Sequence, residues 1–338
     1  MFIVFPGKFE HNTIYQCPCR PLARAGTEYV WSETYPMKRL LYIYNPTAGR
    51  KTAKSSLSDA LEVLARQGYE ITVHPTQERG DATAAVIRQG SQYDRVVCCG
   101  GDGTLNETVQ GLLALPAEQR PVLGYIPAGT TNDFSRTLKL PKTVVELAEM
   151  AGRGLPRRID VGDAQGHPFT YVAAFGLFTD VPYSTPQANK NLLGHFAYLL
   201  EGAGRLINIP SYHMKVTAAE GHEVEGDFIY GMVGNTVSVG GLVNLPRDKV
   251  RLDDGLFEVL LLRLPKTAKD WQSILAALTT LEPDEGGAVL AFSASEVTFT
   301  CSQSVAWTVD GEFGGEQAVT TVRNQTRAIT MACGVPVS

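Results

Sequence analysis

A glycine-rich turn at residues 100–107 constrains the fold of this chain more than any other stretch. It reads Gly-Gly-Asp-Gly-Thr-Leu-Asn-Glu, follows the apolar run Val96–Cys99 and opens a segment with helical spacing. A strand that ends in glycines and restarts as a helix brings backbone N–H groups close to an anion, because glycine has no Cβ to block the approach. If that anion is a polyphosphate, Asp102 places a carboxylate beside it. Two negative groups so close together require a cation between them. The turn therefore predicts a Mg²⁺-nucleotide site.

Two common nucleotide-binding motifs do not fit this turn. It lacks the Gly-x-x-x-x-Gly-Lys-[Ser/Thr] spacing of the P-loop, and Asn106 stands where the dinucleotide pattern Gly-x-Gly-x-x-Gly needs its last glycine. The alternative interpretation is a tight strand-to-helix turn in which glycine serves the backbone geometry alone.

The composition bounds the class of protein. A chain of 338 residues exceeds the usual size of one domain, so two domains are expected. The hydrophobic share of 44% and the charged share of 19% are typical of a soluble globular protein. The net charge of −5 argues against a nucleic-acid partner, whose binding surface would be basic. No apolar run approaches the roughly 18 residues of a transmembrane helix.

The six cysteines do not form the pattern of a disulfide framework. Cys98 and Cys99 are adjacent in an expected buried strand, so their side chains point to opposite faces. Cys17 and Cys19 have no second pair to complete a zinc site. We interpret the thiols as reduced and the compartment as cytosolic.

Residues 1–36 differ from the rest of the chain. They are rich in proline, have no periodicity and lack the order of charge, apolar core and cleavage site that marks a signal peptide. A clean strand begins directly after Met37. We therefore interpret Met37 as the native start, and residues 1–36 as a disordered leader or a mis-assigned start.

Strands and helices alternate from residue 39 to about 152. The predicted strands are Leu40–Tyr44, Tyr69–His74, Arg95–Cys99 and Val122–Ile126, and the predicted helices are 54–67, Asp81–Gln89, Thr104–Ala114, 132–138 and 142–151. This alternation favours an α/β fold with a doubly wound parallel sheet, which binds ligands at the carboxyl ends of its strands. We expect it to form a nucleotide-binding domain over residues 37–157.

Strand-like runs dominate after Arg157. They cover 169–175, 212–218, 226–235, 256–262, 296–300, 305–309 and 326–332, with helical stretches at 190–208 and 267–281. We expect residues 158–338 to form a β-sandwich whose last strand packs back on the first domain. The active site would then lie in the cleft between the domains.

Two further turns resemble the first in chemistry. Asn45-Pro-Thr-Ala-Gly49 ends the first predicted strand and is followed by the basic residues Arg50 and Lys51. Pro127-Ala-Gly-Thr-Thr-Asn-Asp-Phe134 ends the fourth. Either turn can also be explained without a ligand, the former by its proline and glycine and the latter by helix capping through Asn132 or Asp133.

Together these three motifs resemble the catalytic-domain family of diacylglycerol kinases, which includes bacterial soluble lipid kinases and is related to sphingosine and ceramide kinases. The resemblance runs from about residue 38 to the C-terminus. It implies that ATP is the phosphoryl donor. The residues that it implies for ATP binding are Asn45, Pro46, Thr47, Ala48, Gly49, Thr76, Gly100, Gly101, Asp102, Gly103, Thr104, Leu105, Asn106 and Thr130.

The resemblance also implies catalytic and metal-binding residues. Glu312, in the sequence Asp310-Gly-Glu312, corresponds to the proton acceptor of the family, while Asp102 would organise the nucleotide-bound Mg²⁺ and Asp133 would support the polar network. A structural Mg²⁺ would be held by the carbonyls of Arg251 and Leu256 and by the carboxylate of Asp254. Without the resemblance, Asp253-Asp-Gly and Asp310-Gly are ordinary hairpin signals.

The implied reaction is phosphorylation of a lipid hydroxyl, with diacylglycerol the leading acceptor and phosphatidate the product. Such an enzyme would be cytoplasmic and peripheral at the inner face of the membrane, where Leu192–Ile209 is either an interfacial helix or a helix packed on the sandwich. The resemblance is also compatible with a homodimer. The alternatives are a NAD kinase-like enzyme and a catalytically silent nucleotide-binding regulator.

Overall fold

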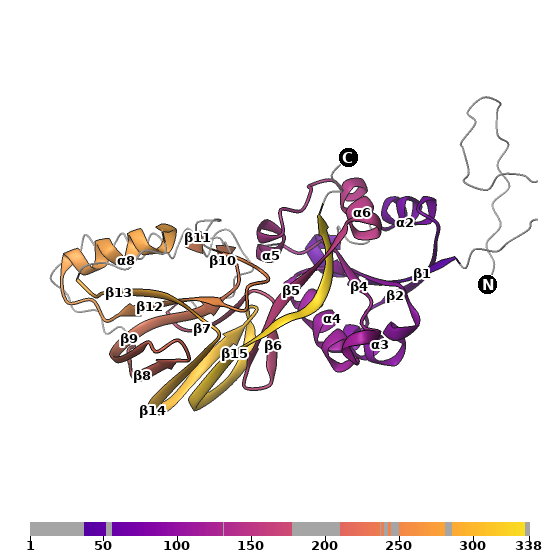
Figure 1. The fold of residues 1–338 in the computed structure, drawn as a ribbon. Coiled ribbons are helices and arrows are strands. Elements are labelled where there is room, and N and C mark those ends of the chain that lie inside the picture. Colours follow the sequence, from indigo (N-terminus) through magenta and orange to yellow (C-terminus); the bar gives the residue numbers. More distant parts are fainter. Residues whose placement is uncertain are drawn as a thin grey trace, which may run out of the picture. The chain divides into compact units, whose positions relative to one another are not determined.

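The computed structural model describes residues 37–51, 56–130, 132–177, 210–236, 238–239, 243–244, 250–280 and 286–334 (Figure 1). The stretch Met37–Ser338 forms one compact unit. The expected leader over residues 1–36 and the expected helix over 190–208 lie outside the described residues.

Four parallel strands form the first part of this unit. They are β1 (Lys38–Tyr44), β2 (Tyr69–Pro75), β3 (Arg95–Gly100) and β4 (Val122–Pro127). Their spatial order is β2-β1-β3-β4, and Leu41 of β1 pairs with Val96 of β3. Both strands are nearly continuous apolar runs, as expected where a parallel sheet is covered on both faces.

Helices cover both faces of these strands. They are α2 (Leu57–Arg66), α3 (Asp81–Gln89), α4 (Asp102–Ala114), α5 (Asp133–Thr137) and α6 (Val144–Arg153), with short 3₁₀ turns η1 (Ala48–Lys51), η2 (Gly90–Gln92) and η3 (Ala117–Gln119). Helices α3 and α4 share one core cluster with Leu41 and Ile43. Helices α2 and α6 share another with Leu40 and Tyr42, which point to the opposite face of β1. The predicted α/β class is confirmed.

The rest of the unit is rich in strands. They are β5 (Leu155–Ala164), β6 (His167–Phe169), β7 (Val172–Gly176), β8 (Tyr212–Ala218), β9 (Glu223–Gly234), β10 (Ser238–Val239), β11 (Val243–Asn244), β12 (Phe257–Arg263), β13 (Val289–Ala294), β14 (Glu296–Val309) and β15 (Glu312–Gly334), with one described helix, α8 (Ala268–Thr280). The two strands predicted at 296–300 and 305–309 are one strand, β14. Its pairing with β15 is irregular between Thr300 and Val305, where the polar run Ser302-Gln-Ser304 interrupts the apolar pattern.

Part of this strand-rich region closes on itself. The long strands β9 and β14 each pair with β8 at one end and with β7 at the other. Aromatic side chains fill the enclosed core, where the ring of Phe175 lies 5.7 Å from that of Phe299 and 5.0 Å from that of Trp307 between centroids. Such rings bury large apolar areas, so they stabilise this closed part.

The parallel and strand-rich parts share one hydrogen-bonded sheet. Its order is β13-β12-β9-β7-β14-β15-β4-β3-β1-β2. Strand β15 pairs antiparallel with β14 and β5, and its end runs parallel to β4, with Met331 opposite Leu123 (Figure 1). The domain boundary expected between residues 157 and 158 falls inside β5.

Candidate active site

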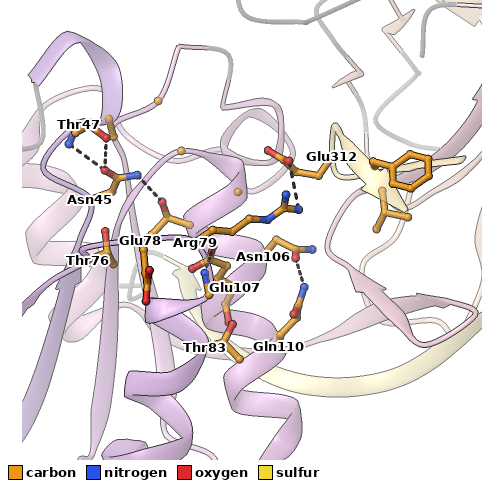
Figure 2. A pocket seen from close by; sticks show the side chains of 18 of the residues that line it. Asn45, Thr47, Thr76, Glu78, Arg79, Thr83, Asn106, Glu107, Gln110 and Glu312 are labelled. Atoms are coloured by element: carbon orange, nitrogen blue, oxygen red, sulfur yellow. Dashed lines mark hydrogen bonds and ion pairs between the residues drawn. The ribbon is translucent and has the colours of Figure 1, made fainter. Parts of the chain in front are cut away.

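A pocket with a volume of about 770 Å³ opens at the carboxyl ends of the parallel strands. Residues of the strand-rich part line it as well, so its two walls come from distant stretches of the chain (Figure 2). The sequence-predicted residues that line it are Asn45, Thr47, Ala48, Gly49, Thr76, Gly101, Gly103, Thr104, Asn106, Thr130 and Glu312.

Backbone hydrogen bonds tie the ends of the parallel strands together beneath this pocket. Thr76 N donates to Tyr44 O over 2.9 Å, Asn45 N to Cys99 O over 3.0 Å, and Ala128 N to Gly100 O over 2.8 Å. These bonds hold the predicted turns in one layer. The resulting wall is called the nucleotide wall below, and consists of the turns at 45–49, 76–80, 100–104 and 127–130.

Two of these turns approach each other so closely that Gly129 has no room for a side chain. A Cβ added at Gly129 would lie 2.6 Å from the Cα of Gly101, which real structures do not tolerate. Gly101 is the residue that precedes α4, so the first N–H groups of this helix open beside the pocket. A helix N-terminus with uncovered backbone amides is suited to bind phosphate oxygens.

Asn45 shapes the first turn of the nucleotide wall. Its Oδ1 accepts hydrogen bonds from Thr47 N at 2.9 Å and from Thr47 Oγ1 at 2.8 Å, and its Nδ2 donates to Thr104 Oγ1 at 3.4 Å. The side chain therefore links this turn to the first turn of α4. The basic residues Arg50 and Lys51 follow this turn in η1.

The side chain of Asn132 does not cap α5, although helix capping was one explanation for this residue. It occupies the position before α5, but its side chain makes no capping hydrogen bond. Its Oδ1 instead accepts from Gly129 N at 3.0 Å, and its Nδ2 donates to Gly129 O at 2.7 Å. Asn132 adopts a left-handed backbone with φ of 50°, which asparagine tolerates better than most residues. Its side chain closes the turn at 127–130.

Asp102 lies at the start of α4 with one oxygen buried. Its Oδ1 accepts no hydrogen bond from the described residues. Burial, together with the neighbouring charges of Asp133 and Asp310, raises the pKa of this carboxyl to about 7, against backbone amides that lower it. An unpaired, partly desolvated carboxylate oxygen among other acids fits a cation shared with phosphates.

Several other predicted residues do not line the pocket with their side chains. Asp133 is 2% exposed, and its Oδ1 lies 3.7 Å from Nη1 of Arg136. Leu105 is fully buried in the core under α4, and Gly100 packs against Thr104. Pro46 lies in the first turn but outside the lining. A role for Leu105 or Gly100 in ATP binding would have to come from their backbones.

The opposite wall of the pocket depends on Asp310, which the sequence did not single out as a site residue. Its Oδ2 accepts from Thr170 N at 2.7 Å, from Thr170 Oγ1 at 2.8 Å and from Asn106 Nδ2 at 2.8 Å. Its Oδ1 accepts from Tyr171 N at 3.0 Å and Val172 N at 3.2 Å. Burial raises its pKa, although these donors lower it. Asp310 thus ties the end of β14 to the start of β7.

Glu312 is the first residue of β15 and directly follows the turn at 310–311. A Cβ added at Gly103 would lie 3.8 Å from Oε1 of Glu312, so the carboxylate faces the first turn of α4 across the pocket. Its Oε2 is 3.5 Å from Nη2 of Arg79 (Figure 2). This second wall, formed by 167–168 and 309–314, is called the acceptor wall below.

Asn106 connects the two walls. Its Nδ2 donates to Asp310 Oδ2 at 2.8 Å and to Pro168 O at 2.9 Å, while its Oδ1 accepts from Gln110. Both N–H groups of the amide are therefore used within the protein, although Asn106 lines the pocket. Glu107 is a further missed residue, since it accepts from Gly80 N at 2.8 Å and Ala82 N at 3.3 Å and so holds the 76–80 turn.

The turn predicted to bind a structural Mg²⁺ is organised by Asp160. The Oδ2 of Asp160 accepts from Gly255 N at 2.7 Å, and its Oδ1 accepts from Arg327 N at 2.7 Å. Asp254 Oδ1 accepts from Leu256 N at 3.1 Å within the turn. Arg251 borders a separate cavity of about 500 Å³.

In the described part of the chain, no three histidine, cysteine, aspartate or glutamate side chains come together as a metal site. Glu258, however, lies 6% exposed in β12, and its Oε2 has no hydrogen-bond partner among the described residues. Burial, with a smaller contribution from the charge of Asp254, raises its pKa to about 8. Oxygen donors and excess negative charge at this turn fit a cation such as Mg²⁺.

Comparisons with known proteins show which family the chain is similar to. The family model of the diacylglycerol kinase catalytic domain matches residues 39–164. The chain is 35% identical over 281 residues to the diacylglycerol kinase of Bacillus subtilis, covering 82% of this chain and 91% of the relative. It is 33% identical to that of Staphylococcus aureus, covering 82% and 87%.

A solved structure shows the same likeness. A crystal structure of a diacylglycerol kinase from Bacillus anthracis superposes with a TM-score of 0.67 at 25% identity, covering 90% of this chain and 99% of that one. No helix among the described residues has the length and apolarity needed to cross a membrane. The identity to the Bacillus and Staphylococcus enzymes, over most of both chains, shows that this protein belongs to the diacylglycerol kinase family and is an ATP-dependent lipid kinase.

Proposed function

We propose that this kinase transfers the γ-phosphoryl group of ATP to the hydroxyl of diacylglycerol and so forms phosphatidate. The observation that carries the proposal is the position of Glu312, whose carboxylate faces the N-terminal turn of α4 across the pocket. A phosphoryl group held at that helix end would lie between the backbone amides and a carboxylate. An alcohol entering beside Glu312 would then meet both a phosphorus atom and a base.

Glu312 acts as the proton acceptor in this proposal. A lipid hydroxyl is a weak nucleophile until a positioned base takes its proton during attack on phosphorus. Glu312 is 57% exposed and lies beside the exposed ring of Phe313, so an amphiphilic alcohol can reach it from outside. Asp310 fixes the turn directly before Glu312, and thus aligns the base with the helix end.

Asp102 is the residue that would hold a nucleotide-bound Mg²⁺, with Asp133 completing the acidic surroundings. When bound, Mg²⁺ neutralises charge on the phosphoryl oxygens during transfer. The buried, unpaired Oδ1 of Asp102 supports this assignment. We propose separately that Arg251, Asp254 and Leu256 hold a structural Mg²⁺ that stiffens the turn before β12.

The proposed acceptor, diacylglycerol, requires the enzyme to work at a membrane surface. Diacylglycerol resides in the bilayer, so we propose a cytoplasmic protein that contacts the inner membrane face while it works. Family membership supports the lipid acceptor over NAD. The intact pair of Asp102 and Glu312 supports catalysis over a silent regulator, because a protein that only binds nucleotide does not need a base.

Replacement of Glu312 tests the assignment of the base. Glu312→Gln is expected to fold and bind ATP normally but to lose turnover by about 10²- to 10⁴-fold, the range for a lost general base. The matched control is Glu316→Gln, an exposed glutamate on the same strand that does not line the pocket, and it is expected to keep wild-type rates. Wild-type turnover in Glu312→Gln would move the base elsewhere, with Asp102 the first alternative.

An acceptor panel tests the substrate. Purified enzyme, radiolabelled ATP and mixed micelles should give labelled phosphatidate with diacylglycerol, and much less product with sphingosine, ceramide, monoacylglycerol, undecaprenol or NAD. A stronger signal from another lipid would replace diacylglycerol in the proposal. Transfer to NAD alone would overturn the lipid acceptor.

A further inference from the structure

Arg79 spans the pocket from the nucleotide wall to the candidate base. It lies in the turn between β2 and α3, and its guanidinium Nη2 is 3.5 Å from Oε2 of Glu312 (Figure 2). Among the described residues that line the pocket, Arg79 is the one arginine or lysine. The side chain therefore supplies a positive charge at the place where the phosphoryl group and the acceptor must meet.

The backbone around Arg79 is fixed although its side chain is exposed. Gln77 N donates to Oδ2 of Asp81 at 2.8 Å, and Gly80 N donates to Oε1 of Glu107 at 2.8 Å. The residues on both sides of Arg79 are thus anchored. The Arg79 and Glu312 side chains are 76% and 57% exposed, so their ion pair is solvated and contributes little to stability.

The charges that line the pocket favour a change of partner for Arg79. Its described lining includes the acids Glu78, Glu107 and Glu312, and Asp102 lies just behind it. A bound triphosphate adds several negative charges to this acidic site. A guanidinium forms stronger, paired hydrogen bonds with a phosphoryl group than it forms with a solvated carboxylate 3.5 Å away. Phosphate therefore competes well for Arg79.

We propose that Arg79 is a further catalytic residue. When ATP binds, its guanidinium breaks its ion pair with Glu312 and contacts the terminal phosphoryl group. This inference rests on the proposed function. The guanidinium then neutralises charge on the transferring group, and Glu312 becomes available to the acceptor hydroxyl. The acceptor oxygen forms its bond to the γ-phosphorus as the bond to the bridging oxygen breaks. The electron pair stays on ADP, and the hydroxyl proton goes to Glu312.

Equilibrium binding of ATP and ADP tests this proposal without the lipid. Arg79→Met is expected to weaken binding of MgATP by about tenfold, the loss expected for one charge-assisted contact, and to leave binding of MgADP unchanged. Arg79→Lys keeps the charge and should recover part of the ATP affinity. The control is Arg88→Met, an exposed arginine on α3 outside the pocket, which should bind both nucleotides as wild type does.

Turnover with diacylglycerol gives the second measurement. Arg79→Met is expected to lower kcat by about 10²-fold or more, as for arginines that stabilise a transferred phosphoryl group. Equal losses of ATP and ADP affinity, unchanged ATP affinity, or faster turnover in Arg79→Met would each overturn the proposal. A selective loss of ATP affinity would support it even if no acceptor in the panel were phosphorylated, which would defeat only the proposed function.

Discussion

The two walls of the pocket are built in opposite ways. The nucleotide wall consists of turns that directly follow parallel strands, and backbone hydrogen bonds and glycines hold it. The acceptor wall depends on Asp310, whose partners in Thr170–Val172 lie about 140 residues earlier in the chain. The turns proposed to bind phosphate thus rest on local backbone geometry, whereas the position of Glu312, the proposed base, is set by buried side-chain contacts between distant segments.

Because of this difference, we expect a substitution that disrupts one wall to leave the structure of the other wall intact. A local turn retains its shape as long as its own strand ends are paired. The acceptor wall loses its shape when one buried carboxylate is removed, because unpaired donors are left in the core. Asn106 is the side chain that joins the two, through its bond to Asp310 at 2.8 Å. The following variants test how independent the walls are.

Asp310→Ala should have the largest effect. It leaves buried donors of Thr170, Tyr171 and Val172 unpaired, and each such group costs about 1–3 kcal/mol, so the free energy of unfolding should fall by about 3 kcal/mol or more. Denaturant titration measures this loss. Phosphoryl transfer should fall to background while binding of ATP changes little.

The control for this variant is Asp163→Ala, which removes one exposed hydrogen bond to Gly166 N at 3.1 Å. It should cost about 1 kcal/mol or less. Loss of ATP binding in folded Asp310→Ala protein, in proportion to the loss of transfer, would contradict the independence of the walls.

Asp102→Asn should have a smaller effect on stability, and one that depends on pH. The pKa of Asp102 is about 7 in the folded protein against an ordinary 3.8. Between these values the folded state binds more protons than the unfolded state, so stability falls as pH rises through this window. Asparagine does not ionise, and the variant should be more stable than wild type above pH 7 and similar to it below about pH 4.

Thermal unfolding without nucleotide at about pH 5 and about pH 8, on either side of the folded pKa, measures this effect. A change of 1 kcal/mol moves Tm by about 2–4 °C in domains of roughly this size, so we expect a rise of a few degrees at the higher pH. Asp59→Asn, on the exposed face of α2, should shift Tm equally at both pH values. A lower Tm for Asp102→Asn at the higher pH would show that the Asp102 charge stabilises the nucleotide wall.

Gly103→Ala should have the smallest effect on folding. The added methyl group would meet only Oε1 of Glu312 at 3.8 Å, which is ordinary contact, and alanine favours a helix over glycine by up to about 1 kcal/mol. Stability should stay level or rise slightly, while KM for ATP rises because the methyl group narrows the space between the walls.

Gly129→Ala provides the contrast to this variant, since its methyl group would lie 2.6 Å from the Cα of Gly101 and must displace a turn. It should lose both stability and ATP binding. Equal behaviour of the two alanine variants would show that close approach of the turns is not what requires glycine.

Most of the parallel part was predictable because its signals are local. The helix Asp81–Gln89 was predicted with its observed bounds, and the four strands differ from prediction by one or two residues at their ends. Strand β5 was missed, since its first half is exposed and its buried Asp160 is unusual in a strand. The hydrogen bonds that explain Asp160 come from Gly255, Asn324 and Arg327, far away in sequence.

The residues of the site differ in the same way: some have a local sequence signal and others depend on contacts between distant segments. The glycine turns carry a sequence pattern that predicts their residues, and most of these residues line the pocket. Asp310 stood in a recognised motif, but nothing in its neighbourhood indicated its five hydrogen bonds. Arg79 lacked any signal, because its partner Glu312 becomes a neighbour only after folding. Glu107 ends the glycine-rich motif, but its contact with Gly80 likewise arises only after folding.

Strand β15 gives the molecule a further property. It begins at Glu312 and ends at Gly334, next to β4, so the final strand completes the sheet of the first part. A fragment that stops near residue 157 would leave β4 as an unprotected edge, prone to associate with other strands. The parallel sheet of the first part therefore gains its last neighbour only when the C-terminal end of the chain is in place.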